Sequence, residues 1–105
     1  MTLCELRRLP LLQTRGIAAA WEKSPETFKY ISECLVRFYN GDYGEVPQED
    51  TEANNRDLLS GEGHVLARYK AKRKLDRDIY IEAHFSESVP GMDANHTMIM
   101  YCDER

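Results

Sequence analysis

The spacing of apolar side chains is most regular between residues 25 and 40. Four of them recur every three or four positions, as on one side of an α-helix, and Cys34 lies on the same side. Ser24 and Pro25 are typical of a helix start, and Gly41 is typical of a helix end. The pattern predicts a helix over 25–40 whose buried side consists of Phe28, Ile31, Leu35 and Phe38.

Three later segments have the character of β-strands, at 64–70, 78–85 and 96–102. In the middle segment every second side chain is apolar, which is the period of a strand with one buried face. The short links 71–77 and 86–95 favour antiparallel neighbours, because parallel strands need longer connections. The middle strand would bury Ile79, Ile81, Ala83 and Phe85, and would expose Tyr80, Glu82 and His84.

Weaker patterns account for the rest of the chain. Residues 9–14 are predicted to be a strand or an extended segment, and residues 17–23 to form one or two helical turns. A second helix is predicted over 48–59, with Leu58 and Leu59 as its buried anchors. Together these elements predict an α+β fold, in which one long helix and a shorter helix pack on a three- to four-stranded antiparallel sheet.

The composition is typical of one soluble domain over residues 1–105, since 42% of the side chains are hydrophobic and 30% are charged. No apolar run approaches the roughly 18 residues of a membrane-spanning helix. The three cysteines are widely spaced and include no Cys-x-x-Cys pair, so they do not form the pattern of a disulfide framework. Because free thiols suit a reducing compartment, we expect a cytoplasmic protein that does not contact membranes.

Charge is segregated along the chain, although the net charge is only −4. Residues 42–57 hold six acidic side chains against one basic one, and residues 68–77 hold six basic side chains against one acidic one. One interpretation is a solvated helix and a solvated hairpin loop. The other is two binding surfaces: an acidic one that occupies a basic groove on a partner, and a basic one that approaches phosphates while tyrosines stack on bases. The candidate partner-binding residues are Asp42, Glu45, Glu49, Asp50 and Glu52, and the candidate nucleic-acid-binding residues are Arg68, Tyr69, Lys70, Lys72, Arg73, Lys74, Arg77 and Tyr80.

Residues suited to catalysis or metal binding are sparse. His84, His96 and Cys102 could meet across neighbouring strands and bind zinc, but no pair has the close spacing of a local ligand motif. Cys34 lies on the apolar side of the predicted helix, where a thiol is normally inert. We therefore expect a protein without catalytic activity or cofactor, and keep a small metal-dependent enzyme as the third hypothesis.

Three stretches carry short motifs that occur together in a known family. They are Leu11-Leu12-Gln13-Thr14-Arg15-Gly16-Ile17, then Gly41-Asp42-Tyr43-Gly44 with Asp50 and Asn54 or Asn55 after it, and finally the strand from His96 to Glu104. In these motifs the chain resembles the small plasmid-related proteins of bacteria, phages and other mobile elements. Tyr43 stands where that family usually has tryptophan, and Arg105 where it usually has a final tyrosine.

The resemblance implies a gene carried on mobile DNA, in a family without an established activity. Small acidic proteins from such genes include anti-CRISPR inhibitors of the type II RNA-guided DNA nuclease, an enzyme that holds nucleic acid in a positively charged channel. The first hypothesis is therefore an inhibitor that binds such a nuclease through one of its charged surfaces. The second is a plasmid or phage accessory protein that binds DNA or RNA through the basic 68–77 hairpin.

Overall fold

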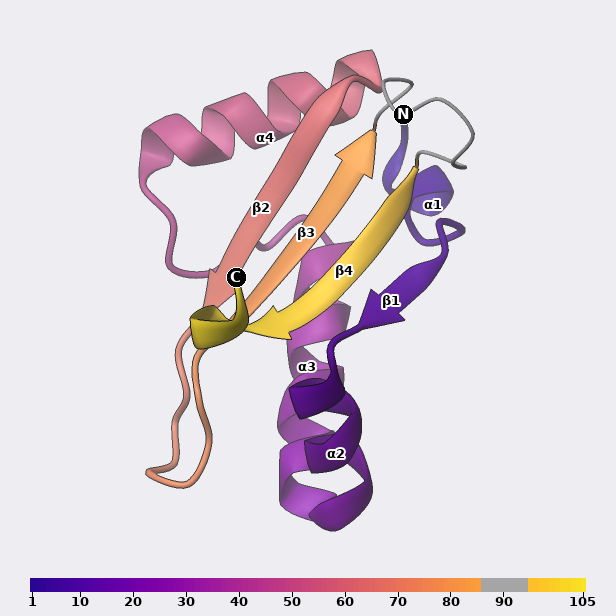
Figure 1. Cartoon of the computed structure of the whole chain (residues 1–105). Coiled ribbons are helices and arrows are strands. Elements are labelled where there is room, and N and C mark those ends of the chain that lie inside the picture. Colours follow the sequence, from indigo (N-terminus) through magenta and orange to yellow (C-terminus); the bar gives the residue numbers. More distant parts are fainter. Residues whose placement is uncertain (86–94) are drawn as a thin grey trace.

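The computed structural model describes residues 1–85 and 95–105, in which helices pack on a four-stranded sheet (Figure 1). No helix of this part of the chain is long and apolar enough to cross a membrane. The α+β class and the positions of the two main helices and three later strands are confirmed. The helices are α1 (Leu3–Leu6), α2 (Arg15–Lys23), α3 (Pro25–Tyr39) and α4 (Gln48–Ser60), and the strands are β1 (Leu11–Gln13), β2 (Gly63–Tyr69), β3 (Ile79–Phe85) and β4 (His96–Tyr101), after which comes a 3₁₀ turn, η1 (Cys102–Glu104).

The sheet is mixed, so the prediction of a purely antiparallel sheet is wrong. Its strand order is β1-β4-β3-β2. The three later strands pair antiparallel as expected, whereas β1 pairs with β4 in parallel. Short links restrict the direction of neighbouring strands. Most of the chain separates β1 from β4, so no such link restricts the direction of β1. The predicted link 86–95 lies, except for its last residue, outside the described residues.

Helix α3 begins and packs largely as its sequence predicts. The Ser24 hydroxyl accepts a hydrogen bond from the Thr27 amide at 3.3 Å, with Pro25 as the first helical residue. Phe28 is an exception, because 42% of its surface remains exposed. Its ring meets the Trp21 ring edge-on at 4.4 Å, and Figure 1 shows that the α2–α3 pair extends beyond the sheet. The buried residues of α3 are Ile31, Cys34, Leu35 and Phe38.

The two faces of the sheet differ in what covers them. Ile79, Ile81, Ala83 and Phe85 are buried on the face toward α2 and α3, as predicted for β3. The opposite face, which we call the open face, is turned to the viewer in Figure 1 and has no helix across its centre. Glu82 was expected to be exposed there but is only 8% exposed. His84 and Arg105, which bind its carboxylate, account for this difference.

Helix α4 lies beside β2, at the β2 edge of the sheet (Figure 1). The prediction that Leu59 anchors this helix is wrong, since 81% of the leucine is exposed. Leu58 does pack against the core, but the most buried residue of α4 is the polar Asn54. Apolar spacing could not indicate Asn54, because its burial depends on hydrogen bonds to β2.

Candidate functional site

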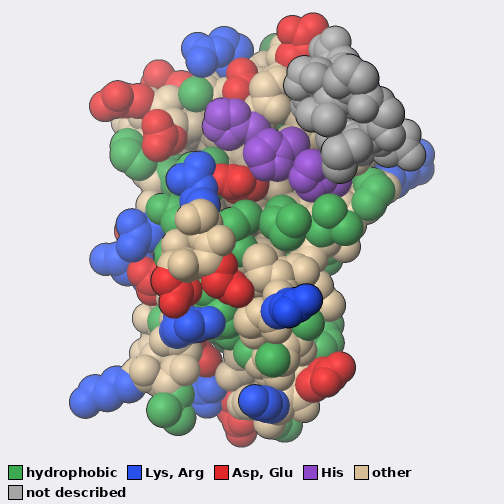
Figure 2. Space-filling view, in the orientation of Figure 1, with side chains coloured by type: hydrophobic (Ala, Val, Ile, Leu, Met, Phe, Trp, Pro, Cys, Tyr) green, Lys and Arg blue, Asp and Glu red, His purple; other side chains and the backbone are tan. Residues whose placement is uncertain are grey.

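Four exposed carboxylates lie on α4 and on the turn before it. Among residues 1–85 and 95–105, none of the four forms an ion pair. Figure 2 shows acidic side chains gathered over α4. We call this group the acidic surface, and its residues are Glu45, Glu49, Asp50 and Glu52.

Asp42, the fifth predicted partner-binding residue, has a local role. Its carboxylate accepts hydrogen bonds from Arg37 Nε at 2.7 Å and from the Gly44 amide at 3.0 Å. The hydrogen bond from Arg37 lowers the pKa of Asp42. Because its charge is matched by Arg37, Asp42 stabilises the turn and adds little to the acidic surface.

Asn54 fixes α4 to the edge of β2. Its side-chain amide donates to the Leu66 carbonyl at 2.8 Å, and its side-chain oxygen accepts from the Leu66 amide at 3.0 Å. The side chain thus pairs with the strand as a neighbouring backbone would. Gly61, at φ 73°, ends the helix in the left-handed conformation that glycine adopts readily. The acidic surface is therefore carried by a helix with a defined position on the sheet.

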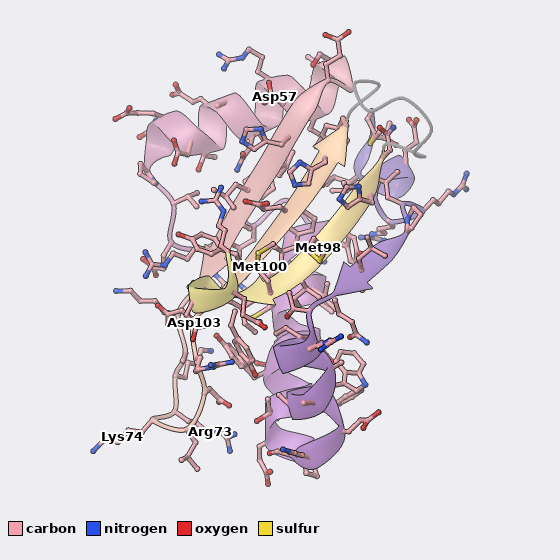
Figure 3. All side chains as sticks on the ribbon, in the orientation of Figure 1. Asp57, Arg73, Lys74, Met98, Met100 and Asp103 are labelled. Atoms are coloured by element: carbon pink, nitrogen blue, oxygen red, sulfur yellow. The ribbon has the colours of Figure 1, made fainter. Side chains whose placement is uncertain are left out.

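The predicted basic hairpin extends away from the sheet, between β2 and β3 (Figure 1). Figure 3 shows Arg73 and Lys74 at its tip. Each arginine of the segment pairs with an aspartate, so much of the positive charge of the hairpin is neutralised. The pairs are Arg73–Asp76 at 2.8 Å, Arg77–Asp103 at 3.1 Å and Arg68–Asp78 at 3.2 Å. Within the described ranges, the exposed cations of the hairpin that form no ion pair are Lys70, Lys72 and Lys74.

The two tyrosines proposed to stack on bases have different environments. Tyr69 is fully buried, and its hydroxyl donates to the Asp42 carbonyl at 2.6 Å. The prediction that Tyr69 stacks on a base is therefore wrong, because alternation along β2 turns this residue into the core. Tyr80 is half-buried on the open face, with the guanidinium carbons of Arg68 and Arg105 at 5.9 and 5.1 Å from its ring centre.

The three histidines form a row across the open face, visible in purple in Figure 2. His84 lies directly opposite both His64 and His96 in the strand register, with ring centres 6.2 and 5.1 Å apart. The rings of His84 and His96 are stacked, an arrangement that does not turn two nitrogens toward one ion.

The proposed metal cluster of His84, His96 and Cys102 is not assembled. Cys102 follows the opposite end of β4 from His96, about 20 Å away for a strand of this length. Within the described residues, no three histidine, cysteine or acidic side chains are grouped to hold a metal ion. The third hypothesis, a metal-dependent enzyme that uses these three residues, required a strand register that would bring them together, and the observed register does not.

Cys34 occupies the buried position expected from its place on α3. Only 2% of the residue is exposed. Burial raises the pKa of the Cys34 thiol to about 12, so the thiol stays protonated at neutral pH. This environment is that of a core residue and not of a nucleophile.

A pocket of about 260 Å³ lies between α3 and the basic hairpin. Its charges are balanced, with three acidic and three basic side chains around the hydroxyphenyl group of Tyr30. The Tyr30 hydroxyl already donates to the Arg77 carbonyl at 2.9 Å. A pocket with this balance does not favour a ligand of one charge. The six charged residues are Glu26, Lys29, Glu33, Lys72, Arg73 and Asp76.

Sequence reasoning missed two features that depend on tertiary structure. The histidine row follows from strand register, and the Asn54 clamp follows from the position of α4 beside β2. The Asp-x-x-x-Asn spacing had marked Asn54 or Asn55 but gave no role to either. No family model, curated protein or solved structure matches the chain.

Proposed function

We propose that the chain is a non-enzymatic inhibitor from a phage or plasmid, and that its acidic surface occupies a basic channel of a bacterial defence nuclease. The observation that supports this proposal is the contrast between the two charged regions. The carboxylates of the acidic surface are unpaired within the described residues, whereas the arginines of the hairpin pair with aspartates. Unpaired charge on a fixed helix is available to a partner.

The spacing of these carboxylates along α4 is similar to the spacing of phosphate charges along the nucleic acid that such a channel normally holds. Glu49, Asp50 and Glu52 lie within about 4.5 Å along the helix axis, at 1.5 Å of rise per residue. Double-stranded DNA carries one negative charge per roughly 1.7 Å of its axis. A basic channel built for nucleic acid would therefore meet a similar local charge density on α4.

The type II RNA-guided nuclease is the target implied by the resemblance to plasmid-related proteins. Such nucleases hold the guide–target duplex in a positively charged channel through its backbone and not its sequence. An acidic protein surface could compete there without reading any base. The host cytoplasm is where this contact would occur.

The test is DNA cleavage by a guide-loaded type II nuclease, with and without the protein, beside a gel shift on free DNA. We expect inhibition of cleavage and no shift. Charge reversal in the triple variant Glu49→Lys, Asp50→Lys and Glu52→Lys should remove the inhibition. A matched control reverses three exposed acids elsewhere, at Glu22, Glu33 and Glu62, and should retain it. Equal loss of inhibition in both triples would show that only net charge matters and would contradict the proposal.

A second candidate function is binding of DNA or RNA by the basic hairpin. The observation that favours it is the exposure of Lys70, Lys72 and Lys74 without ion pairs among the described residues. Three phosphate contacts on duplex DNA predict a log–log salt slope of about −2.7. A gel shift with that slope, lost when the lysines are changed to glutamine, would favour this candidate over the inhibitor.

A further inference from the structure

The two edges of the sheet differ in whether their outward-facing backbone groups are hydrogen-bonded by the described residues. At the β2 edge, the outward-facing backbone groups are paired. The Asn54 clamp holds Leu66, and the Arg68 amide and carbonyl bond with the turn before α4 at 3.1 and 2.7 Å. Natural proteins cover an exposed edge in this way to prevent another strand from pairing with it. The groups that cover β2 come from Tyr43, Glu45, Asn54 and Asp57.

The β1 edge has no such cover among the described residues. Pro10 and Thr14 direct backbone groups to β4, where they bond with Thr97 and Ile99 at 2.8 and 3.3 Å. Since alternate residues of a strand face opposite neighbours, the backbone groups of Leu11 and Gln13 point away from the sheet. All three residues of β1 are exposed, with 42% of Leu11 and 46% of Leu12 accessible.

Apolar side chains continue from this edge onto the open face. Leu12 is paired with Met98 in the parallel register, so the two side chains lie on the same face. Figure 3 shows Met98 and Met100 on β4. A strand added to β1 would place every second side chain on the open face, one of them beside Leu12, and would extend the apolar row.

The charged residues on either side of β1 indicate which kind of strand could pair with its edge. Arg7 and Arg8 precede β1 and Arg15 follows it, and there is no acidic residue between Glu5 and Glu22. Among the described residues, the acidic side chain bonded to this segment is Glu104, whose oxygens accept from the Thr14 hydroxyl at 2.6 Å and the Gly16 amide at 3.3 Å. None of the three arginines forms an ion pair among the described residues, so unpaired positive charge lies at both ends of β1, with Glu104 beside one of them.

This charge disfavours a second copy of the chain as the occupant. In a two-fold pairing centred on Leu12, residue 8 of one copy lies beside residue 16 of the other. Arg8 would then face Gly16 of its partner, one position from the partner's Arg15, at both ends of the pair, and like charges brought close together are unfavourable. The complementary occupant is an extended segment that carries acidic residues at its two ends.

We propose that the free edge of β1 binds an extended peptide segment of another protein by strand addition, with alternate apolar side chains and acidic flanks. Backbone hydrogen bonds to Leu11 and Gln13 supply the pairing, and Arg8 and Arg15 supply the selectivity. This site lies at the opposite edge of the sheet from α4 and is independent of the proposed inhibition.

The experiment measures binding of blocked nine-residue peptides to the full chain by fluorescence anisotropy. One probe has the sequence Glu-Glu-Val-Thr-Val-Thr-Val-Glu-Glu, and a second replaces each glutamate by lysine. A third is the acidic probe with N-methyl groups on its five central residues. We expect saturable binding of the acidic probe, binding about tenfold weaker for the lysine probe, and none for the methylated probe.

Two variants of the protein make the test specific. Gln13→Pro removes an outward-facing amide and should abolish binding, with its folding checked by circular dichroism. The double variant Arg8→Glu and Arg15→Glu should reverse the preference between acidic and lysine probes, an exchange that loss of folding does not produce. Binding of the methylated probe, or an unchanged preference in the double variant, would overturn the proposal. Dimerisation of the wild type that Gln13→Pro abolishes would also overturn it, in favour of a second copy.

Discussion

Replacement of Asn54 by alanine tests whether α4 is held to the sheet by a single polar side chain. The change removes two hydrogen bonds, of 2.8 and 3.0 Å, to the backbone of Leu66. At about 1 kcal/mol for each bond, with a further part for the unpaired groups of half-buried Leu66, we expect a loss of about 2–3 kcal/mol in the free energy of unfolding. At an m-value of about 1.5 kcal/mol/M, the urea midpoint falls by roughly 1–2 M.

Asn55→Ala is the matched control for this experiment. The neighbouring asparagine is on the same helix but is exposed. Both replacements gain about the same in helix propensity, so the difference between the two variants isolates the clamp. Urea unfolding followed by far-ultraviolet circular dichroism measures it. If the two variants unfold within about 0.5 kcal/mol of each other, the clamp does not hold α4 and this reasoning is wrong.

Three more predictions concern charge, packing and thiol reactivity. The hydrogen bond from Arg73 lowers the pKa of Asp76, so this ion pair stabilises the fold above about pH 4 and is lost as the pH falls further. The Asp76→Asn replacement should therefore reduce the pH dependence of the urea midpoint in that acidic range. Phe38→Ala should cost about 3–5 kcal/mol in unfolding free energy, and Phe28→Ala about 1 kcal/mol, because the first ring is buried and the second is partly exposed. Ellman's reagent should modify exposed Cys4 at once, and buried Cys34 only after denaturation, as followed by absorbance.

Local sequence signals were sufficient for the main helices and the antiparallel strands. Ser24 and Pro25 begin α3 through interactions within one turn, and the alternation in β3 reflects a period of two. Phe28 shows the limit of the helical pattern. Its spacing predicts that it lies on the buried side, but its ring packs against Trp21 and 42% of its surface stays exposed.

Only the runs of acidic and basic residues in the candidate site could be predicted from the sequence. A run of acidic residues on a helix can be found in the sequence, and so can a run of cations. Whether each charge is already paired depends on distant residues, as with Arg77 and Asp103. Strand register likewise decides which histidines meet, and the parallel contact of β1 with β4 has no local signal.

The measurement that tests the central claim most directly is competition for a guide-loaded type II nuclease. Binding of catalytically blocked nuclease to target DNA would be titrated at increasing concentrations of this protein. If the acidic surface occupies the nucleic-acid channel, the apparent dissociation constant for DNA rises in proportion to the added protein, and the Glu49→Lys, Asp50→Lys and Glu52→Lys triple has no effect. Unchanged DNA affinity at saturating protein would contradict the account.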